Sequence, residues 1–304
     1  MNSIETDFEV IIIGGSYAGL SAATSLGRAL RRVLVIDSGK PCNRQTPHSH
    51  NFLTRDGETP SAITQIALEQ LTMYSTVKLI ADTVTNAIAK EDGFRIQTLS
   101  GKKYIAKKVL FATGIKDILP DIPGFSECWG VSVIHCPYCH GYEVRQQPTG
   151  ILGNGDTGYE YAKLINNWTK DLTLFTNGAA TLSVEQVKAL QSRNINIEES
   201  KVREIVHENG YIKGISLEND RIYLINALYN RPAFVQHCDL PGKLECNLTD
   251  MGYINVDGFG RTNIPGIYAA GDNTTPMRAV SMSVALGTAA GAFINKDLID
   301  NNYI

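Results

Sequence analysis

The sequence predicts an α/β protein in which one supersecondary unit, made of strand, glycine-rich turn, helix and strand, occurs twice. The first copy spans the β-branched run 8–13, an Ala/Leu-rich segment and a second buried run at 33–36. The same order returns between residues 149 and 176. A chain of 304 residues is long enough for two domains, each with its own core. We therefore expect two Rossmann-like domains, each with the three-layer arrangement of helices on both faces of a sheet.

The first glycine-rich turn, GGSYAG at residues 14–19, lies between the first strand and the first helix. Gly14 and Gly19 permit a tight turn and a close approach of the backbone to a pyrophosphate at the helix N-terminus. Ser16 stands where the middle glycine would be, and Asp37 closes the second strand, where an acid can bond a ribose 2′-hydroxyl. We expect these four residues to contact a dinucleotide.

Between the two copies, the chain carries a polar loop and a series of regular segments. The loop, residues 39–57, includes His48, His50 and Asn51. Loops in this place commonly lie along a bound cofactor, although surface histidines are more often simply solvated. After it we expect a helix at 59–74, strands at 77–89, 94–99 and 109–113, and a hinge in the Pro-rich stretch 119–124.

The second glycine-rich turn, GNGDTG, has all the glycines of the dinucleotide pattern, Gly153, Gly155 and Gly158. The strand that follows ends in TNGAA at 176–180, where an acid for NAD or basic residues for NADP would be expected. This half of the chain therefore either binds a nucleotide weakly or has lost it.

The rest of the chain continues the α/β pattern. We expect a helix at 184–193, alternating strands over 195–228 with a hairpin turn at 209–210, and a loop from 231 to 244. A last strand ends in Gly271 and Asp272, and a closing helix at 277–298 is rich in Ala, Gly and Ser. Small residues permit close approach to a sheet or flat ring, or ordinary tight helix packing, and the sequence leaves both open.

A Cys-x-x-Cys pair, Cys136 and Cys139, lies in the segment HCPYCHGYE at 135–143. Two thiols at this spacing can close a disulfide with little backbone movement, and the thiolate is the reactive form. Pro137 suits the first position of a helical turn, which would put Cys136 at a helix N-terminus, where the pKa of a thiol falls. The pair is therefore a candidate redox centre.

Other interpretations of this pair are weaker. A zinc site needs about four ligands, and the remaining cysteines form no second pair of this spacing. These cysteines are Cys42, Cys128, Cys238 and Cys246. CPYCH is also the attachment pattern of a c-type haem, which requires export, and the N-terminal residues do not resemble a signal peptide. A pair of inert core cysteines is the third alternative. We expect no metal.

Charge and composition exclude several kinds of partner. The chain has 28 basic and 31 acidic residues and a net charge of −3, which favours neither nucleic acid nor an anionic membrane. No apolar run is long enough for a membrane span. We expect the protein to act in a reducing cytoplasm, where a Cys-x-x-Cys pair is more often catalytic than structural.

Taken in order, these motifs resemble the low-molecular-weight thioredoxin reductases and related FAD-dependent disulfide oxidoreductases. The resemblance covers the whole chain and rests on the turn at 14–19, ATG at 112–114, the cysteine pair, the turn at 153–158, and PGIYAAGD at 265–272 followed by RAV at 278–280. It implies an FAD-binding domain of residues 1–116 and 244–304. It also implies an inserted NAD(P)-binding-like domain, 117–243, that carries the cysteines, and a homodimer.

Several residue roles follow from the resemblance. The residues that it assigns to FAD beyond the first glycine turn are Asn51, Thr113, Gly114, Gly271, Asp272, Arg278, Ala279 and Val280. Asp272 would bond the ribityl chain, and the helix start after Arg278 would face the pyrimidine edge of the flavin. Cys139 would be the sulfur next to the flavin, and Cys136 the one that exchanges with substrate.

Two departures point to one branch of this family. His140 follows the second cysteine where the reductases carry an acid, and the basic phosphate clamp is missing after Thr176. The strings CPYCHGYE and HNFLTRDG look closer to the gliotoxin- and holomycin-type dithiol oxidases, in which flavin passes electrons from a dithiol to oxygen. Because histidine titrates close to neutral pH, we expect His140 to take the thiol proton, with His50 as a second candidate.

The resulting expectation is an FAD-dependent thiol–disulfide oxidoreductase that acts on a thioredoxin-like protein or a small dithiol or disulfide. Its electron donor would be NAD(P)H or another reductant. A dithiol oxidase is the alternative within this class. A flavin-binding redox sensor or carrier without turnover is the alternative outside it.

Overall fold

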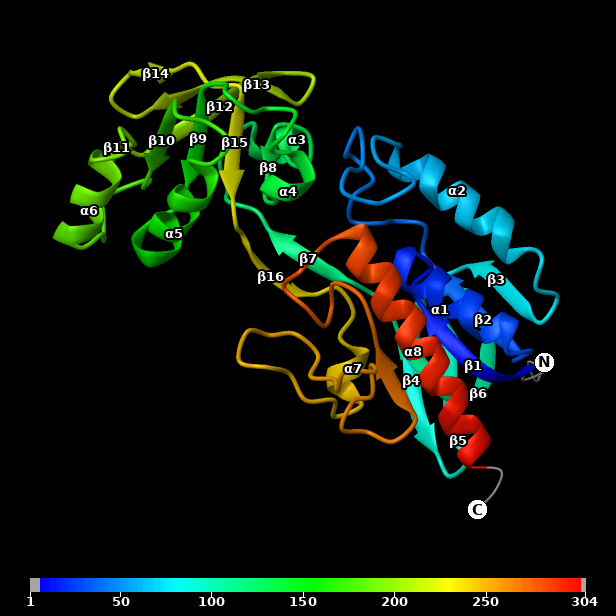
Figure 1. Cartoon of the computed structure of the whole chain (residues 1–304). Helices are drawn as coiled ribbons and strands as arrows, with labels where there is room; N and C mark the ends of the chain where they lie inside the picture. Colours follow the sequence, from blue (N-terminus) through cyan, green and yellow to red (C-terminus); the bar gives the residue numbers. More distant parts are fainter. Residues whose placement is uncertain (1–5, 302–304) are drawn as a thin grey trace. The chain divides into compact units, whose positions relative to one another are not determined.

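The computed structural model describes residues 6–301, which form two compact α/β units (Figure 1). Unit 1 comprises residues 6–44, 51–116 and 234–301, and unit 2 comprises residues 45–50 and 117–233. The second unit is therefore inserted into the first. Unit 1 resumes at Phe234 rather than at residue 244, because Leu240 and Cys246 are buried in its core. The expected domain ends at residues 1 and 304 lie outside the described residues.

A mainly parallel sheet forms the core of unit 1, in the order β3-β2-β1-β6-β5-β4, with β17 paired to β6. Its strands are β1 (Thr6–Ile13), β2 (Val33–Asp37), β3 (Val77–Ala81), β4 (Val84–Lys90), β5 (Gly93–Thr98), β6 (Lys103–Phe111) and β17 (Ile267–Ala269). β1 pairs in parallel with β2 and β6, so the carboxyl ends of these strands meet at one edge of the sheet. The single strand expected at 77–89 is wrong, because β3 pairs with β2 at one end of the strand order and β4 pairs with β5 at the other end.

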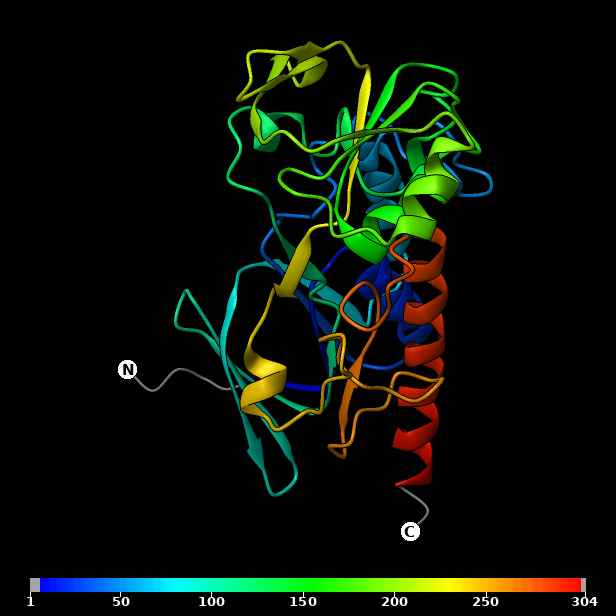
Figure 2. The ribbon, with the colours of Figure 1, turned by 90° about the vertical axis from the view of Figure 1, so that its left-hand side faces the viewer.

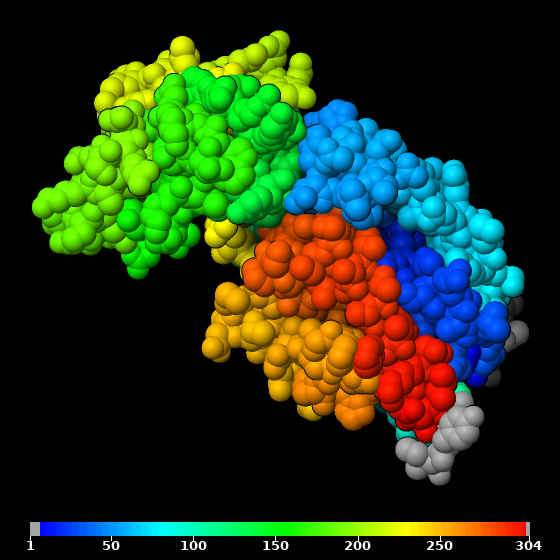
Figure 3. Space-filling model, in the orientation of Figure 1, coloured from blue at the N-terminus to red at the C-terminus, as the bar shows by residue number. Residues whose placement is uncertain are grey.

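The helices of unit 1 are α1 (Tyr17–Arg28), α2 (Pro60–Leu71), α7 (Leu240–Lys243) and α8 (Val280–Asp300). α8 lies along α1 in both ribbon views and in the space-filling view (Figures 1, 2 and 3). A Cβ at Gly287 would stand 2.1 Å from Ala18 O, and one at Gly291 would stand 2.8 Å from Ala22 O. At these two positions, the small residues of α8 therefore serve helix packing.

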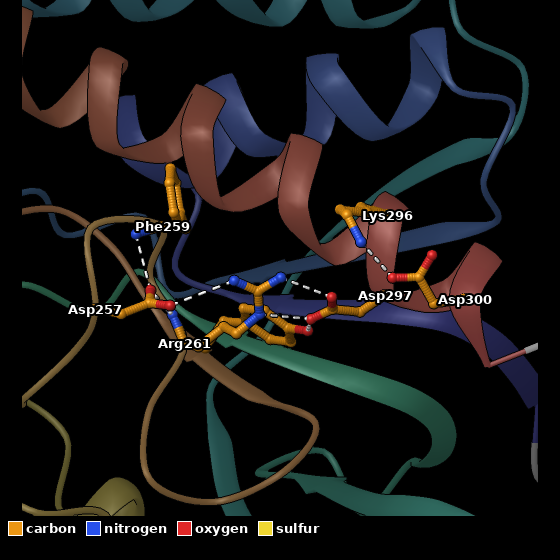
Figure 4. A network of polar contacts seen from close by, with 7 residues as sticks. Asp257, Phe259, Arg261, Lys296, Asp297 and Asp300 are labelled. Carbon is orange, nitrogen blue, oxygen red and sulfur yellow. Dashed lines mark hydrogen bonds and ion pairs between the residues drawn. The ribbon is translucent and has the colours of Figure 1, made fainter.

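A polar network holds the C-terminal part of α8 against the segment that precedes β17 (Figure 4). Arg261 donates from Nε and Nη2 to the two carboxylate oxygens of Asp297, at 2.8 and 2.7 Å, and lies 3.3 Å from Asp257. The buried Tyr268 donates its hydroxyl to the same carboxylate. The bonds from Arg261 hold the pKa of Asp297 below its usual range, so this carboxylate is charged at neutral pH.

Unit 2 is built on a parallel sheet in the order β11-β10-β9-β15-β8. Its strands are β8 (Val133–Ile134), β9 (Thr149–Leu152), β10 (Leu172–Phe175), β11 (Asn196–Glu198) and β15 (Ala227–Asn230). The helices are α3 (Phe125–Cys128), α4 (Pro137–His140), α5 (Gly155–Ile165) and α6 (Val184–Gln191). A separate antiparallel sheet consists of β12 (Val202–Glu208), β13 (Tyr211–Leu217) and β14 (Ile222–Tyr223). Ile205 and Ile215 of this sheet share one apolar core with Phe175 and Leu228 of the parallel sheet.

The chain passes between the units along β7 (Ile115–Ile118) and β16 (Ala233–Gln236), which pair with each other. The continuous loop expected from 231 to 244 is wrong, since this stretch contains β16 and α7. Gln236 fixes the end of β16 by donating from Nε2 to Gly252 O at 2.9 Å and to Asn273 O at 3.1 Å. Within residues 6–301, no helix is both long and apolar enough to cross a membrane.

Candidate active site and cofactor site

Cys136 and Cys139 form a disulfide in unit 2, with their Cα atoms 5.3 Å apart. Pro137 takes the first position of α4, and Cys136 is the N-cap residue. The amides of Cys139 and His140 both donate to Cys136 O at 3.2 Å, which closes the turn around the pair. The expectation of a helical turn with Cys136 at its N-terminus is confirmed.

Aromatic side chains support this turn. Gly141 follows α4 and lies against the indole of Trp168, where a Cβ would come within 3.0 Å of the ring. Trp168 contacts the exposed Tyr138 edge to face, with ring centroids 5.4 Å apart. On the other side of the pair, the buried Tyr161 donates its hydroxyl to His135 O. The backbone on both sides of the disulfide is therefore held by contacts that the motif itself does not reveal.

Three titratable side chains gather beside the disulfide turn, namely His140, His50 and Glu143. His50 Nε2 lies 3.6 Å from Glu143 Oε1. Burial lowers the pKa of His140 and the charge of His50 lowers it further, whereas the carboxylate of Glu143 acts in the opposite direction. A neutral imidazole can accept a proton, which a general base for a thiol must do. The structure thus brings together the two histidines singled out in the sequence and adds Glu143, which the sequence did not indicate.

A cavity of about 670 Å³ is lined by all three of these side chains. Pro47 and His48 join His50 on one wall. Apolar side chains form much of the remaining surface, among them Val131, Ile134, Ile212 and Leu224. A mainly apolar cavity of this size with a few convergent polar groups is typical of a small-molecule site.

The first glycine turn offers a place for a pyrophosphate in unit 1. A Cβ at Gly14 would stand 2.2 Å from Ala112 O, and one at Gly19 would stand 1.9 Å from Gly14 O, so only glycine fits at these positions. Ser16 is the N-cap of α1, and its side chain caps no backbone amide among the described residues. The first turn of α1 in this described stretch also carries no acid. The N–H groups and partial positive charge of this helix end therefore fit an anionic phosphate.

Asp37 ends β2 beside this turn. Its carboxylate oxygens accept hydrogen bonds from Gly15 N at 2.9 Å and from Gly39 N at 3.0 Å. Each oxygen keeps a further lone pair, so bonding to a ribose hydroxyl remains open to Asp37. Asn51 is exposed and has a left-handed φ of 60°. Its backbone N–H donates a hydrogen bond to Asp56 Oδ1 at 2.6 Å. The role of Asn51 toward a cofactor stays a prediction.

A second group of unit 1 residues follows β6 or precedes α8. Thr113 Oγ1 is buried and has no hydrogen-bond partner in the described part of the chain, as expected of a group that bonds to a ligand. Asp272 accepts a hydrogen bond from Ser283 Oγ at 3.2 Å and lies 3.8 Å from Arg278 Nε. The N-cap and the first residue of α8 are Ala279 and Val280. The partial positive charge of that helix end can stabilise negative charge on a bound flavin.

Backbone geometry explains the glycines of this second group. Gly114 and Gly271 have φ values of 63° and 97°, which glycine adopts without strain. Asn273 directly follows the Gly-Asp pair but was not singled out in the sequence. It is fully buried, and its Nδ2 donates to Phe111 O at 2.8 Å, which ties this segment to the end of β6. With the unpartnered Thr113 hydroxyl and the two helix ends, these residues fit FAD in unit 1.

The second glycine turn is closed by side chains of unit 2. Asn154 is the N-cap of α5, and its Oδ1 accepts hydrogen bonds from Gly155 N and Thr181 N, both at 2.8 Å. Its Nδ2 donates to Ala179 O at 2.9 Å. The first turn of α5 also carries Asp156. The helix end that would receive a pyrophosphate is therefore filled by an amide group and followed by an acid, both unfavourable to phosphate.

The glycines of this second turn have a packing role of their own. A Cβ at Gly158 would stand 2.9 Å from the carbonyl carbon of Gly153, and Gly155 has a φ of 56°. In the segment where a nucleotide ribose would lie, Ala180 N donates to the carboxylate of Glu199 at 2.9 Å. The contact between strand and helix thus explains Gly153 and Gly158, and the left-handed φ explains Gly155, in each case without a bound nucleotide.

A Cys-x-x-Cys disulfide in unit 2 with two histidines in the wall of a nearby cavity, and a glycine turn in unit 1 that fits the phosphates of FAD, are the features expected of a flavin-dependent disulfide oxidoreductase. Residues 8–289 match the family described as pyridine nucleotide-disulphide oxidoreductase, and the chain belongs to this family. Its relatives include fungal proteins named thioredoxin reductase, which confirms the resemblance to the thioredoxin reductases expected from the sequence.

Thioredoxin reductase aclD of Aspergillus oryzae is 30% identical over 308 residues, which cover 96% of this chain and 96% of that protein. Thioredoxin reductase sirT of Leptosphaeria maculans is 29% identical over 306 residues, covering 95% and 93%. The solved structure of putative thioredoxin reductase TrxB from Bacillus anthracis has a TM-score of 0.93 at 33% identity, covering 97% of this chain and 99% of that one. The predicted fold class, FAD and flavoprotein disulfide oxidoreductase activity are confirmed. The roles of individual residues remain predictions.

Proposed function

We propose that this protein oxidises a small dithiol, with the Cys136–Cys139 disulfide as the exchange centre and His140 as the base. The observation that carries the choice of direction is the closed second glycine turn. A nicotinamide nucleotide would have to displace the hydrogen bonds of Asn154 and place its phosphates next to Asp156. Electrons therefore enter from a dithiol, and oxygen is the final acceptor.

The cavity beside the disulfide turn supports a small molecule as the substrate. Its volume of about 670 Å³ lies within the range of roughly 300–1,000 Å³ that drug-sized ligands occupy. A protein partner such as thioredoxin would contact an exposed surface instead of filling a cavity. The cavity walls also include His140, so a thiol bound there would lie close to the proposed base.

The chemistry of the pair is thiol–disulfide exchange. A substrate thiolate attacks the sulfur of Cys136, the Cys136–Cys139 bond breaks, and Cys139 leaves as a thiolate. The second substrate thiol gives its proton to His140, attacks the substrate sulfur of the mixed disulfide and expels Cys136. The products are a substrate disulfide, one cysteine thiolate and one cysteine thiol, the thiol taking its proton back from His140. When bound, FAD supplies the two-electron acceptor that allows the protein disulfide to form again.

An anaerobic titration of the yellow holoprotein tests this proposal. We expect dithiothreitol to bleach the flavin absorbance, and NADPH and NADH to leave it unchanged. Cys136→Ser and Cys139→Ser should each abolish the bleaching by dithiothreitol, since neither variant retains the disulfide that accepts the electrons of the dithiol. Rapid bleaching by either nicotinamide would overturn the proposed direction.

A reductase that uses NAD(P)H is the second candidate. It is favoured by the retention of Gly153, Gly155 and Gly158, and by thioredoxin reductase relatives that cover 95% and 96% of the chain. The same titration separates the two candidates, since a reductase is bleached by a nicotinamide. A redox sensor without turnover would bleach with a reductant but would consume no oxygen in steady state.

We further propose that the protein is a homodimer that acts in the cytoplasm, as the family resemblance implies. The chain has a mass of 33.2 kDa. Light scattering of the purified holoprotein should give twice this mass. A single-chain mass at micromolar concentration would contradict the dimer.

A further inference from the structure

Glu143 contacts a histidine that comes from a distant part of the sequence. Its Oε1 lies 3.6 Å from Nε2 of His50, and the two side chains are 41% and 21% exposed. An ion pair this open to solvent contributes little to stability, typically less than about 1 kcal/mol. The importance of the contact therefore lies in what it does to the neighbouring group, His140.

We propose that Glu143 is a positioning residue for thiol–disulfide exchange, which holds His50 in the cavity wall and balances the charge of His50 beside His140. This inference rests on the proposed function of His140 as the base. It assigns to Glu143 a role that neither the cysteine motif nor the glycine turns indicate.

The placement of the three groups supports this role. His140 is on α4, Glu143 follows α4, and His50 comes from the 45–50 segment, yet all three line one cavity. A protonated His50 disfavours a second positive charge on His140, and the carboxylate of Glu143 favours it. The two groups act on the pKa of His140 in opposite directions. Removal of His50 should therefore raise this pKa, and removal of the Glu143 carboxylate should lower it.

Other charged or titratable groups lie on the cavity walls or close to them. The ring of His48 lies 6.4 Å from that of His50, centroid to centroid. Lys213 of β13 lines the cavity and lies 3.6 Å from Glu208 Oε2. Tyr229 on β15 does not line the cavity. Burial raises its pKa most, and the carboxylate of Glu143 lies near enough to raise this pKa further, so the hydroxyl stays neutral. Glu208 is thus a matched control, since it forms a carboxylate–cation pair of the same length at another wall of the cavity.

The experiment is an NMR titration of the histidine rings in the holoprotein, labelled with ¹³C-histidine, with His140→Ala to assign the signal. Glu143→Gln should lower the pKa of His140, and His50→Asn should raise it, each by about 0.5 pH unit. Glu208→Gln should leave the pKa of His140 within about 0.1 unit of the wild-type value. Glu143→Asp keeps the charge and should restore most of the wild-type behaviour.

The single-turnover rate of exchange with dithiothreitol, measured against pH in the same variants, supplies the functional readout. For a base, the rising limb of this profile follows the pKa of His140, so Glu143→Gln should move it to lower pH and His50→Asn to higher pH. Equal pKa values of His140 in Glu143→Gln and Glu208→Gln would overturn the inference. If the ring pKa values move as expected but the rate profile is the same even in His140→Ala, the base assignment in the proposed function is the part that fails.

Discussion

Gly287 on α8 gives a prediction in which two effects of one methyl group oppose each other. Alanine favours a helix over glycine by about 1 kcal/mol, so Gly287→Ala should stabilise α8 in isolation. In the folded protein, however, the new Cβ would stand 2.1 Å from Ala18 O, whereas real Cβ atoms essentially never come within 3.0 Å of another heavy atom. α8 would have to move away from α1 by at least the difference, 0.9 Å.

The steric effect should win. Extra methyl groups in a tightly packed contact cost about 1–3 kcal/mol, and here the cost lies toward the upper end because the neighbouring contact of Gly291 with Ala22 O must open too. After the gain in helix propensity is subtracted, we expect a net loss of about 1–2 kcal/mol in the free energy of unfolding. Ala18 is in the first turn of α1 and belongs to the glycine-rich segment 14–19, so we also expect weaker retention of FAD.

Urea unfolding of the holoprotein, followed by circular dichroism and by release of FAD fluorescence, measures both effects. Gly242→Ala in α7 is the control, because no heavy atom lies within 4 Å of its added Cβ and only the propensity gain applies. If Gly287→Ala is as stable as the wild-type protein or more stable, while Gly242→Ala behaves as expected, the contact between α1 and α8 does not require glycine at position 287.

Three further predictions concern single side chains. Asn154→Ala removes the side chain that caps α5 and accepts a hydrogen bond from Thr181 N. The free energy of unfolding, measured in urea, should therefore fall by about 2 kcal/mol. Thr113→Val should weaken the retention of FAD by about tenfold, measured by FAD release, with little change in the stability of the apoprotein. Asp297→Asn should destabilise unit 1 at neutral pH, because the folded state holds this carboxylate charged through Arg261. Since the pKa is lowered in the folded state, that contribution is present above the unfolded pKa of about 3.9 and is lost as the pH falls through the folded value, so thermal unfolding curves of the two proteins should converge in acid.

The duplicated strand–turn–helix units could be predicted because their signals are local. Buried β-branched runs alternate with glycine turns and helical segments, and the unit expected between residues 149 and 176 is formed by β9, α5 and β10. The helical turn at Pro137 follows from the fixed φ of proline and its missing amide hydrogen. Errors occurred where a side chain far away in the sequence fixes the backbone. One example is β16, whose end depends on the bonds of Gln236 to Gly252 and Asn273.

The residues of the candidate site likewise fall into two classes, those that the local sequence predicts and those that only the fold brings together. The cysteine pair and its neighbour His140 could be found because they lie together in the sequence, and His50 because it lies in a loop of unusual composition. Glu143 was not found, since only the fold brings it within 3.6 Å of His50. The closure of the second turn was also hidden. In the sequence, Asn154 between two glycines is compatible with nucleotide binding. Only the fold shows that Thr181 N donates a hydrogen bond to the side chain of Asn154 at this helix end.

The two glycine turns show why a complete motif can be a worse guide than an incomplete one. The first turn lacks its middle glycine, yet the side chain of Ser16 leaves the backbone N–H groups of α1 available to a phosphate. The second turn has every glycine, yet Asn154 satisfies Gly155 N and Thr181 N with a single side-chain oxygen. Glycines in this pattern indicate that a strand and a helix approach each other closely. Phosphate binding depends instead on whether the backbone N–H groups at the start of the helix are already hydrogen-bonded. If electrons do not enter through the second unit, its remaining task is to hold Cys136, Cys139 and His140 on α4, and that requires a rigid sheet and no nucleotide.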